Sequence, residues 1–180
     1  MGKALFLDRD GVLNVDKGYV SQIKDFEFVP GVFEALREAE KQGYALFIIT
    51  NQSGIARGFY TEADYHKLTE WMLEQFSDEH IAITQVYYCP YYSKGTIPEF
   101  TQASELRKPN PGMILLAKEE HGLTLTESIL VGDKETDIEA GVRAGLSCTI
   151  LVSGEPGASS AANYRIDSIA ELPRILGWGS

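Results

Sequence analysis

The sequence predicts an α/β fold, a single doubly wound, Rossmann-like parallel sheet flanked by helices. Short apolar segments alternate along the chain with longer segments of helical period, which is the pattern of a parallel sheet. The chain has 180 residues, a length that fits one domain, and no stretch between the expected elements is long enough for a separate cap. We therefore expect residues 1–180 to form one domain without a large cap domain.

Five strands are expected, each a short apolar run followed by polar or small residues. They cover residues 4–7, 45–49, 83–88, 129–131 and 148–152. In open parallel sheets, ligands bind beyond the carboxyl ends of the strands. The polar residues that follow these strands are therefore the candidates for a functional site.

Helices are expected between the strands. The first covers residues 32–42 and ends before Gly43, a residue type common just past a helix end. The second covers residues 61–76, begins with a Thr-x-x-Asp capping pattern and spaces its apolar residues three to four apart. Two more are expected from Pro111 to Gly122 and over residues 135–144, with a loop over 154–163 and a short last helix over 169–176.

The acidic composition argues against polyanionic partners. There are 16 Lys and Arg residues against 26 Asp and Glu, a formal net charge of −10. Nucleic acids and anionic membrane surfaces are bound largely through Lys and Arg, so neither is an expected partner. No apolar run approaches the ~20 residues of a membrane span, and no signal-peptide pattern is present. We expect a cytoplasmic monomer in which Cys89 and Cys148 are reduced, buried thiols.

Two carboxylates, Asp8 and Asp10, follow the first expected strand. Side chains two residues apart in an extended segment point the same way, so both can face one site while Arg9 points elsewhere. Two like unit charges 4 Å apart cost about 4 kcal/mol at an effective dielectric of 20, so either one group is protonated or a cation lies between them. A protonated Asp can act as a general acid, and Mg²⁺ takes carboxylate oxygens. An isolated Asp-x-Asp-Gly is equally compatible with an Asx turn that closes the strand.

Three further polar segments lie at expected strand or helix ends. Residues 50–53 offer a hydroxyl and backbone N–H groups to an anion, although they are also compatible with a helix cap. Arg107 and Lys108 precede a helix, and the prolines that follow restrict the backbone enough to hold Lys108, although each residue alone is compatible with solvated surface charge. Asp133 and Asp137 form a third acidic cluster, which an acidic first helical turn also explains.

Together, in this order, these segments resemble the four motifs of the haloacid-dehalogenase-like phosphatases. The matching residues are Phe6-Leu7-Asp8-Arg9-Asp10-Gly11, Ile49-Thr50-Asn51, Lys108, and Gly132-Asp133 with Asp137. Within that family the likeness is closest to the phosphatases of heptose bisphosphates, and histidinol-phosphate phosphatases share the same core motifs. The likeness to the heptose bisphosphate branch extends over residues 14–20, 50–58, 87–90, 107–113 and 131–134, and is thin beyond residue 152.

The resemblance implies a Mg²⁺-dependent phosphomonoesterase that removes the C7 phosphate of a heptose bisphosphate in lipopolysaccharide precursor synthesis, through an aspartyl-phosphate. It implies that Asp8 is the nucleophile and that Asp10 is the general acid and then the base. Thr50 and Lys108 would contact the transferring phosphoryl group. Asp8, the Asp10 backbone carbonyl and Asp133 would bind Mg²⁺, with Asp137 supporting the metal through hydrogen bonds. The implied contacts to the small phosphorylated sugar are Asp16, Lys17, Gly18, Tyr19, Asn51, Gln52, Ser53, Arg107 and Lys134.

The sequence departs from many relatives in the loop over residues 91–106. Those relatives hold a structural zinc there, with a Cys-x-His followed later by Cys-x-Cys. This chain keeps Cys89 but has Tyr91, Ser104 and Leu106 at the other ligand positions. One soft ligand cannot build a four-coordinate zinc site, so we expect no zinc. The aromatic residues Tyr91, Tyr92 and Phe100 are expected to order the loop instead.

Three other functions compete with this interpretation. A phosphatase for histidinol phosphate or another small sugar phosphate would share the motifs. A phosphoacceptor receiver module also combines acidic residues, a Thr and a Lys with a parallel sheet. Its acceptor Asp, however, follows the middle strand and its Lys follows the last one, whereas here Lys108 precedes Asp133. An inactive sugar-phosphate binding protein is disfavoured because both Asp8 and Asp10 are present.

Overall fold

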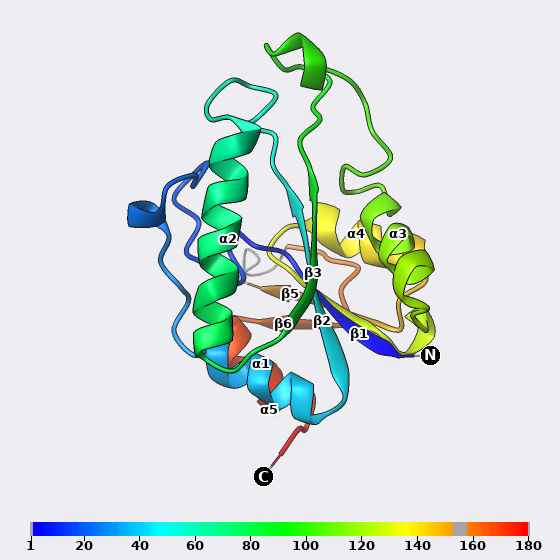
Figure 1. The fold of residues 1–180 in the computed structure, drawn as a ribbon. Helices are drawn as coiled ribbons and strands as arrows, with labels where there is room; N and C mark the ends of the chain where they lie inside the picture. Colours follow the sequence, from blue (N-terminus) through cyan, green and yellow to red (C-terminus); the bar gives the residue numbers. More distant parts are fainter. Residues whose placement is uncertain (1, 153–157, 180) are drawn as a thin grey trace.

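A six-stranded, fully parallel sheet runs through the protein, in a computed structural model that describes residues 2–152 and 158–179 (Figure 1). The strand order is β3-β2-β1-β4-β5-β6. The strands are β1 (Lys3–Leu7), β2 (Tyr44–Asn51), β3 (Ile83–Cys89), β4 (Ile129–Gly132), β5 (Cys148–Val152) and β6 (Tyr164–Ile166). The predicted doubly wound α/β sheet is thus confirmed, and no cap domain is evident among the described residues.

Five helices flank the sheet at the positions that the sequence predicts. They are α1 (Val32–Lys41), α2 (Glu62–Asp78), α3 (Gly112–His121), α4 (Glu135–Ala144) and α5 (Leu172–Ile175). The predicted capping pattern of α2 is present, because the Thr61 hydroxyl accepts from the Asp64 N–H and the Asp64 carboxylate accepts from the Thr61 N–H. Short 3₁₀ turns lie at Ile23–Asp25 (η1), Pro98–Phe100 (η2), Leu125–Glu127 (η3) and Ile169–Glu171 (η4). None of the described helices is long and apolar enough to span a membrane.

Both faces of the sheet are buried, which is why the strands are continuously apolar. In β1, Leu5 and Leu7 pack in one core with residues of α1, α2 and α5. Ala4 and Phe6, on the opposite face, pack with residues of α3 and α4. Figure 1 shows the two helical layers on either side of the sheet. Burial on both faces fixes the positions of the strand ends and of the side chains that follow them.

The sixth strand, β6, was not among the five expected from the sequence, so the predicted number of strands is wrong by one. β6 has three residues, and it pairs in parallel with β5 at the edge of the sheet. Tyr164 and Arg165 are exposed and only Ile166 is buried, so the strand has almost no apolar pattern. Of the loop predicted over 154–163, residues 158–163 lie in neither a helix nor a strand, and the remainder lies outside the described residues.

The strand order reverses direction at β1. The chain proceeds from β1 outward to β2 and β3, and then returns to place β4 on the other side of β1. A crevice forms at such a switch point, beyond the carboxyl ends of the two strands. Asp8 follows β1 there and its N–H donates to Val131 O at 3.0 Å, while Asp133 follows β4. The topology therefore places the first and fourth predicted motifs side by side.

Candidate active site

A buried ammonium group, that of Lys108, joins the motifs at the centre of the site. Its Nζ donates to Asp8 Oδ1 at 3.0 Å, to Asp137 Oδ1 at 2.6 Å and to Ile49 O at 2.9 Å. The lysine side chain is 3% exposed, and these three acceptors use all three of its protons. Although burial lowers the pKa of Lys108, the carboxylates of Asp137 and Asp8 raise it above its ordinary value. Lys108 is therefore a fixed cation, as the sequence predicts.

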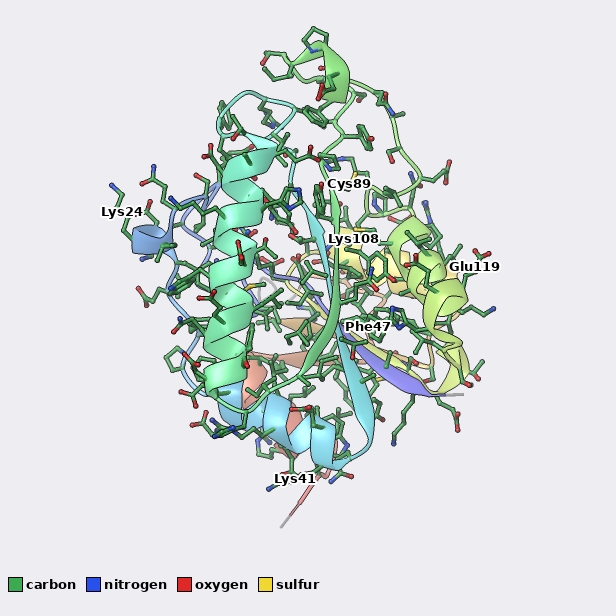
Figure 2. The ribbon with its side chains drawn as sticks, in the orientation of Figure 1. Lys24, Lys41, Phe47, Cys89, Lys108 and Glu119 are labelled. Atoms are coloured by element: carbon green, nitrogen blue, oxygen red, sulfur yellow. The ribbon has the colours of Figure 1, made fainter. Side chains whose placement is uncertain are left out.

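The segment that carries Lys108 is bound to the end of β2 through Asn51. The Lys108 N–H donates to Asn51 Oδ1 at 3.1 Å, and Asn51 Nδ2 donates to Lys108 O at 3.2 Å. This reciprocal pair ties the second motif to the third. Figure 2 shows Lys108 at the end of the sheet opposite Lys41, beyond buried Phe47.

Asp8, Asp133 and Asp137 form a carboxylate cluster whose ligand oxygens lie within 4.8 Å of one another. Burial, followed by the charge of Asp137, raises the pKa of Asp8 well above its ordinary value against the opposing effect of Lys108. Burial also raises the pKa of Asp133 to about 6. These shifts follow mainly from burial of the carboxyl groups, with the nearby charge of Asp137 adding to them, and a bound cation would oppose both causes.

The cluster fits a hard divalent cation such as Mg²⁺. Asp133 Oδ1 is buried and has no hydrogen-bond partner, so one carboxylate oxygen is left for a ligand bond. Both oxygens of Asp137 are already used, by Lys108 and by the Lys134 N–H at 3.1 Å. This arrangement suits the predicted division, in which Asp8 and Asp133 bind the metal and Asp137 supports the site. It is the only such acidic, His or Cys cluster found among the described residues.

Gly11 allows the turn after β1 to approach Asp133. Its φ is +88°, in the left-handed region, and a Cβ built there would lie 2.1 Å from Asp133 Oδ2. Any side chain at this position would therefore displace the carboxylate that carries the unpartnered oxygen.

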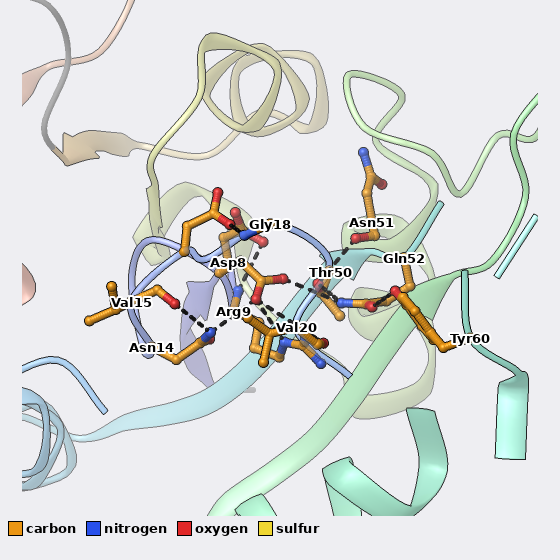
Figure 3. A network of polar contacts seen from close by, with 12 residues as sticks. Asp8, Arg9, Asn14, Val15, Gly18, Val20, Thr50, Asn51, Gln52 and Tyr60 are labelled. Atoms are coloured by element: carbon orange, nitrogen blue, oxygen red, sulfur yellow. Dashed lines mark hydrogen bonds and ion pairs between the residues drawn. The ribbon is translucent and has the colours of Figure 1, made fainter. Parts of the chain in front are cut away.

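Asp10 is held by three side chains, those of Arg9, Asn14 and Gln52, which are labelled in Figure 3. Its Oδ1 accepts from Arg9 Nη2 at 3.1 Å and from Asn14 Nδ2 at 3.0 Å, and its Oδ2 lies 3.5 Å from Gln52 Nε2. The expectation that Arg9 points elsewhere is wrong, because the buried guanidinium folds back onto Asp10 and also donates to Val20 O at 2.8 Å. Sequence spacing alone misses this contact, since alternation fixes the direction of a Cβ but not the end of a long side chain.

The Thr50 hydroxyl is oriented by a buried Gln52 and Tyr60. Gln52 Nε2 donates to Thr50 Oγ1 at 2.9 Å, and the Tyr60 hydroxyl donates to Gln52 Oε1. Thr50 Oγ1 accepts from the amide, and its own proton makes only a long contact of 3.5 Å to Asn51 O, which an incoming anion can replace. Burial raises the pKa of Tyr60, which keeps the phenol protonated. Sequence reasoning missed Tyr60, since a single aromatic residue in a loop carries no distinguishing pattern.

A cavity of about 400 Å³ opens in front of these groups. It is lined by Asp10, Asp16, Gly18, Tyr19, Asn51, Gln52, Ser53, Tyr60, Arg107, Lys108, Lys134 and Thr136. All of the predicted substrate contacts except Lys17 are among them, whereas Asp8 and Thr50 are buried and are not part of the lining. Lys17 lies outside this lining, pairs with Glu27 at 3.2 Å and has a side chain that is 43% exposed, so its contact with the substrate stays a prediction.

The positions that hold zinc in many relatives make contacts of another kind here. The Cys89 thiol donates to Tyr91 O at 3.8 Å, and Ser104 Oγ accepts from the Leu106 N–H at 3.1 Å. The rings of Tyr91 and Phe100 lie 6.1 Å apart. Both cysteines are free, Cys89 buried and Cys148 half-buried, so the expectation that both are buried holds for Cys89 alone.

The protein is a haloacid-dehalogenase-like hydrolase by its fold and its site. On a doubly wound sheet, paired acids follow β1, a hydroxyl lies at the end of β2, an acidic cluster follows β4, and a buried lysine joins them. In agreement, residues 105–172 match a family described as "HAD-hyrolase-like". The chain belongs, more narrowly, to the family of the D-glycero-beta-D-manno-heptose-1,7-bisphosphate 7-phosphatases. It is 45% identical to the protein of that name from Escherichia coli K12, over 96% of this chain and 93% of the relative. It is 46% identical to the one from Haemophilus influenzae, over 98% and 97%.

A solved structure has the same fold over nearly its whole length. The D,D-heptose 1,7-bisphosphate phosphatase from B. bronchiseptica, complexed with magnesium and phosphate, superposes with a TM-score of 0.84 at 25% identity. The match covers 97% of each chain. A relative that binds Mg²⁺ and phosphate on this fold agrees with the cation-compatible acidic cluster described above.

Proposed function

We propose that the protein hydrolyses the C7 phosphate ester of D-glycero-beta-D-manno-heptose 1,7-bisphosphate, in the supply of lipopolysaccharide precursors. The observation that carries the proposal is the pairing of buried Asp8 with Lys108, beside an immobilised Asp10, at the base of the cavity. The cavity is of the size usual for small ligands. Arg107 and Lys134 on its wall suit the second phosphate of a bisphosphate, which a monophosphate would leave unmatched.

The first half of the reaction transfers the phosphoryl group to Asp8. A carboxylate oxygen of Asp8 attacks phosphorus, the bond from phosphorus to the C7 oxygen breaks, and Asp10 donates its proton to that leaving oxygen. Arg9, Asn14 and Gln52 keep the Asp10 carboxyl in place for this transfer. In the second half, Asp10 accepts a proton from water, which attacks the phosphorus and releases inorganic phosphate and free Asp8.

Positive charge is required because both the nucleophile and the phosphate are anions. Lys108 and the Thr50 hydroxyl would face the transferring group, Lys108 as a fixed cation and Thr50 as a donor directed by Gln52. Mg²⁺ held by Asp8, the Asp10 backbone carbonyl and Asp133 would supply the remaining charge stabilisation when bound.

Release of inorganic phosphate from a substrate panel tests the proposal. The panel contains both anomers of the heptose bisphosphate, fructose 1,6-bisphosphate, histidinol phosphate and p-nitrophenyl phosphate, each with Mg²⁺ and with a chelator. We expect a kcat/KM for a heptose bisphosphate at least tenfold above the others, dependence on Mg²⁺, and loss of activity in Asp8→Asn. Equal turnover of all substrates would refute the substrate assignment, and activity in Asp8→Asn would refute the mechanism.

We further propose that the enzyme acts as a monomer in the cytoplasm. Two free cysteines and a formal net charge of −10, which disfavours binding to anionic membranes, support this setting. Light scattering on the eluting protein should give a mass near the 19.9 kDa of one chain, and a mass of twice that value would contradict the monomer.

A further inference from the structure

Four side chains from separate loops form a stack along the wall of the cavity. The Arg57 guanidinium carbon lies 4.3 Å from the centre of the Tyr92 ring, and that of Arg107 lies 4.8 Å from the same centre. The guanidinium carbon of Arg57 also lies 5.8 Å from the centre of the Tyr19 ring. The Tyr19 ring in turn contacts the Phe59 ring edge to face, with the ring centres 4.7 Å apart. We call Tyr19, Arg57, Tyr92 and Arg107 the arginine–tyrosine stack. Two of its members, Tyr19 and Arg107, line the cavity.

Both arginines of the stack have unused donors. Arg57 Nε and Arg107 Nη1 are buried and have no hydrogen-bond partner. Neither guanidinium forms an ion pair with a carboxylate of the described residues. Buried donors without partners are uncommon, and they occur where a ligand completes the set. Among the described side chains, the two guanidinium groups have aromatic rings as their partners, so an anion at Arg107 would meet a free donor.

The loop that carries Tyr92 is attached to the loop that carries Arg57 by backbone hydrogen bonds. The N–H groups of Thr96 and Ile97 donate to Ala56 O at 2.8 and 2.9 Å, and the Thr96 hydroxyl donates to Arg57 O at 3.0 Å. The loops approach so closely that a Cβ at Gly95 would lie 2.6 Å from Ala56 O. This attachment holds the loop that carries Tyr92 beside the loop that carries Arg57.

The arginine side chain is long and flexible, so a cation aimed at a ligand needs a support. Arg107 is tethered by its backbone to the segment that holds Lys108, but its guanidinium has only the Tyr92 ring as a described side-chain partner. A planar guanidinium held flat on a ring loses less freedom when it binds an anion. The ring is in turn held by Arg57.

We propose that Tyr92, held by Arg57, is a positioning residue that aligns Arg107 with the phosphate that is not hydrolysed. The proposal rests on the proposed function for the identity of the substrate. Its effect is on recognition of the second anion, because no member of the stack contacts Asp8 or Asp10 in a described hydrogen bond or ion pair.

Kinetics of Tyr92→Leu and Tyr92→Phe test the role of the ring. We expect Tyr92→Leu to raise KM for the heptose bisphosphate about tenfold, the effect expected for loss of one partly desolvated cation–π contact, with kcat within twofold of the wild type. KM for p-nitrophenyl phosphate, which has no second anion, should not change. Tyr92→Phe keeps the ring and should retain the wild-type KM. A fall in kcat on both substrates, or a Tyr92→Phe variant as impaired as Tyr92→Leu, would overturn the proposal.

A binding measurement separates this proposal from the proposed function. In the Asp8→Asn background, which lacks the nucleophile, titration calorimetry compares the affinity for glucose 1-phosphate with and without Tyr92→Leu. A decrease of about tenfold supports the stack, and equal affinities overturn it. Failure of the wild-type enzyme to hydrolyse the heptose bisphosphate would overturn the proposed function without bearing on this comparison.

Discussion

Replacing Asp133 with Asn removes a carboxylate that is costly in the metal-free protein and useful only when a cation is bound. Burial raises the pKa of Asp133 to about 6, from an ordinary value of 3.8. The native state therefore holds the proton more tightly than the unfolded chain between these two values. Stability should fall as the pH rises through this window, because the folded carboxyl must ionise in a site that burial has removed from water and that lies beside the charge of Asp137.

The size of the effect follows from the shift. A difference of roughly two pKa units corresponds to about 3 kcal/mol, which we reduce to about 2 kcal/mol because Asp133 is only partly buried. At pH 7.5 without metal, Asp133→Asn should therefore be about 2 kcal/mol more stable than the wild type. Below about pH 3 the two should be equally stable, since the carboxyl is then largely protonated in both the folded and the unfolded states.

Urea unfolding between pH 3 and 8, with EDTA and with millimolar Mg²⁺, measures both the pH dependence of stability and the stabilisation by the metal. Mg²⁺ should stabilise the wild type at pH 7.5 and leave Asp133→Asn nearly unchanged, because the variant has lost a ligand oxygen. The matched control is Asp78→Asn, an exposed carboxylate at the end of α2 that should respond to neither pH nor metal in this way. Destabilisation of Asp133→Asn in EDTA at pH 7.5, or equal stabilisation of both proteins by Mg²⁺, would refute the reasoning.

Three other substitutions, with Lys17→Ala as a control, probe the buried lysine, the donor to Gln52 and the cavity wall. Lys108→Met leaves Asp8 and other buried acceptors without their cation, so it should lower the free energy of urea unfolding by about 3–5 kcal/mol and abolish phosphate release. Tyr60→Phe removes the donor to Gln52, and we expect kcat to fall about tenfold with an unchanged circular dichroism spectrum; an unchanged kcat would contradict the orientation of Thr50 by this pair. Lys134→Ala, at the cavity wall, should raise KM for the bisphosphate about tenfold, whereas Lys17→Ala, outside the cavity, should not; equal effects would show that the cavity is assigned wrongly.

The sequence predicted the sheet and most of the cavity because both depend on strand ends. Parallel strands buried on both faces produce apolar runs that are easy to locate, and the polar residues that follow them must meet at one edge. Asp10 and Asn51 lie where this rule expects them, and Lys108 reaches the same edge from the segment that precedes α3, tied to Asn51. β6 escaped prediction because an exposed edge strand of three residues needs no apolar pattern.

The errors concern side chains whose ends are placed by tertiary contacts. Arg9 folds back onto Asp10, although it lies in a motif that was correctly located. The substrate contact of Lys17 stays a prediction, and its ammonium group pairs with Glu27 outside the cavity lining. Tyr60 enters the site because its loop folds over Gln52, a contact between residues eight positions apart in an irregular segment. Nothing in local spacing specifies such contacts, since they depend on the path of a loop and the rotamer of a long side chain.

The contact between Lys108 and Asp8 joins residues 100 positions apart in the chain. During synthesis from the amino terminus, β1, β2 and β3 leave the ribosome well before Lys108 does, and Asp133 follows later still. An incomplete chain therefore carries Asp8 without Lys108, the cation that pairs with it, and without Asp133. The site is complete only after β4 has been inserted beside β1. A product of translation that stops before β4 should therefore have no phosphatase activity.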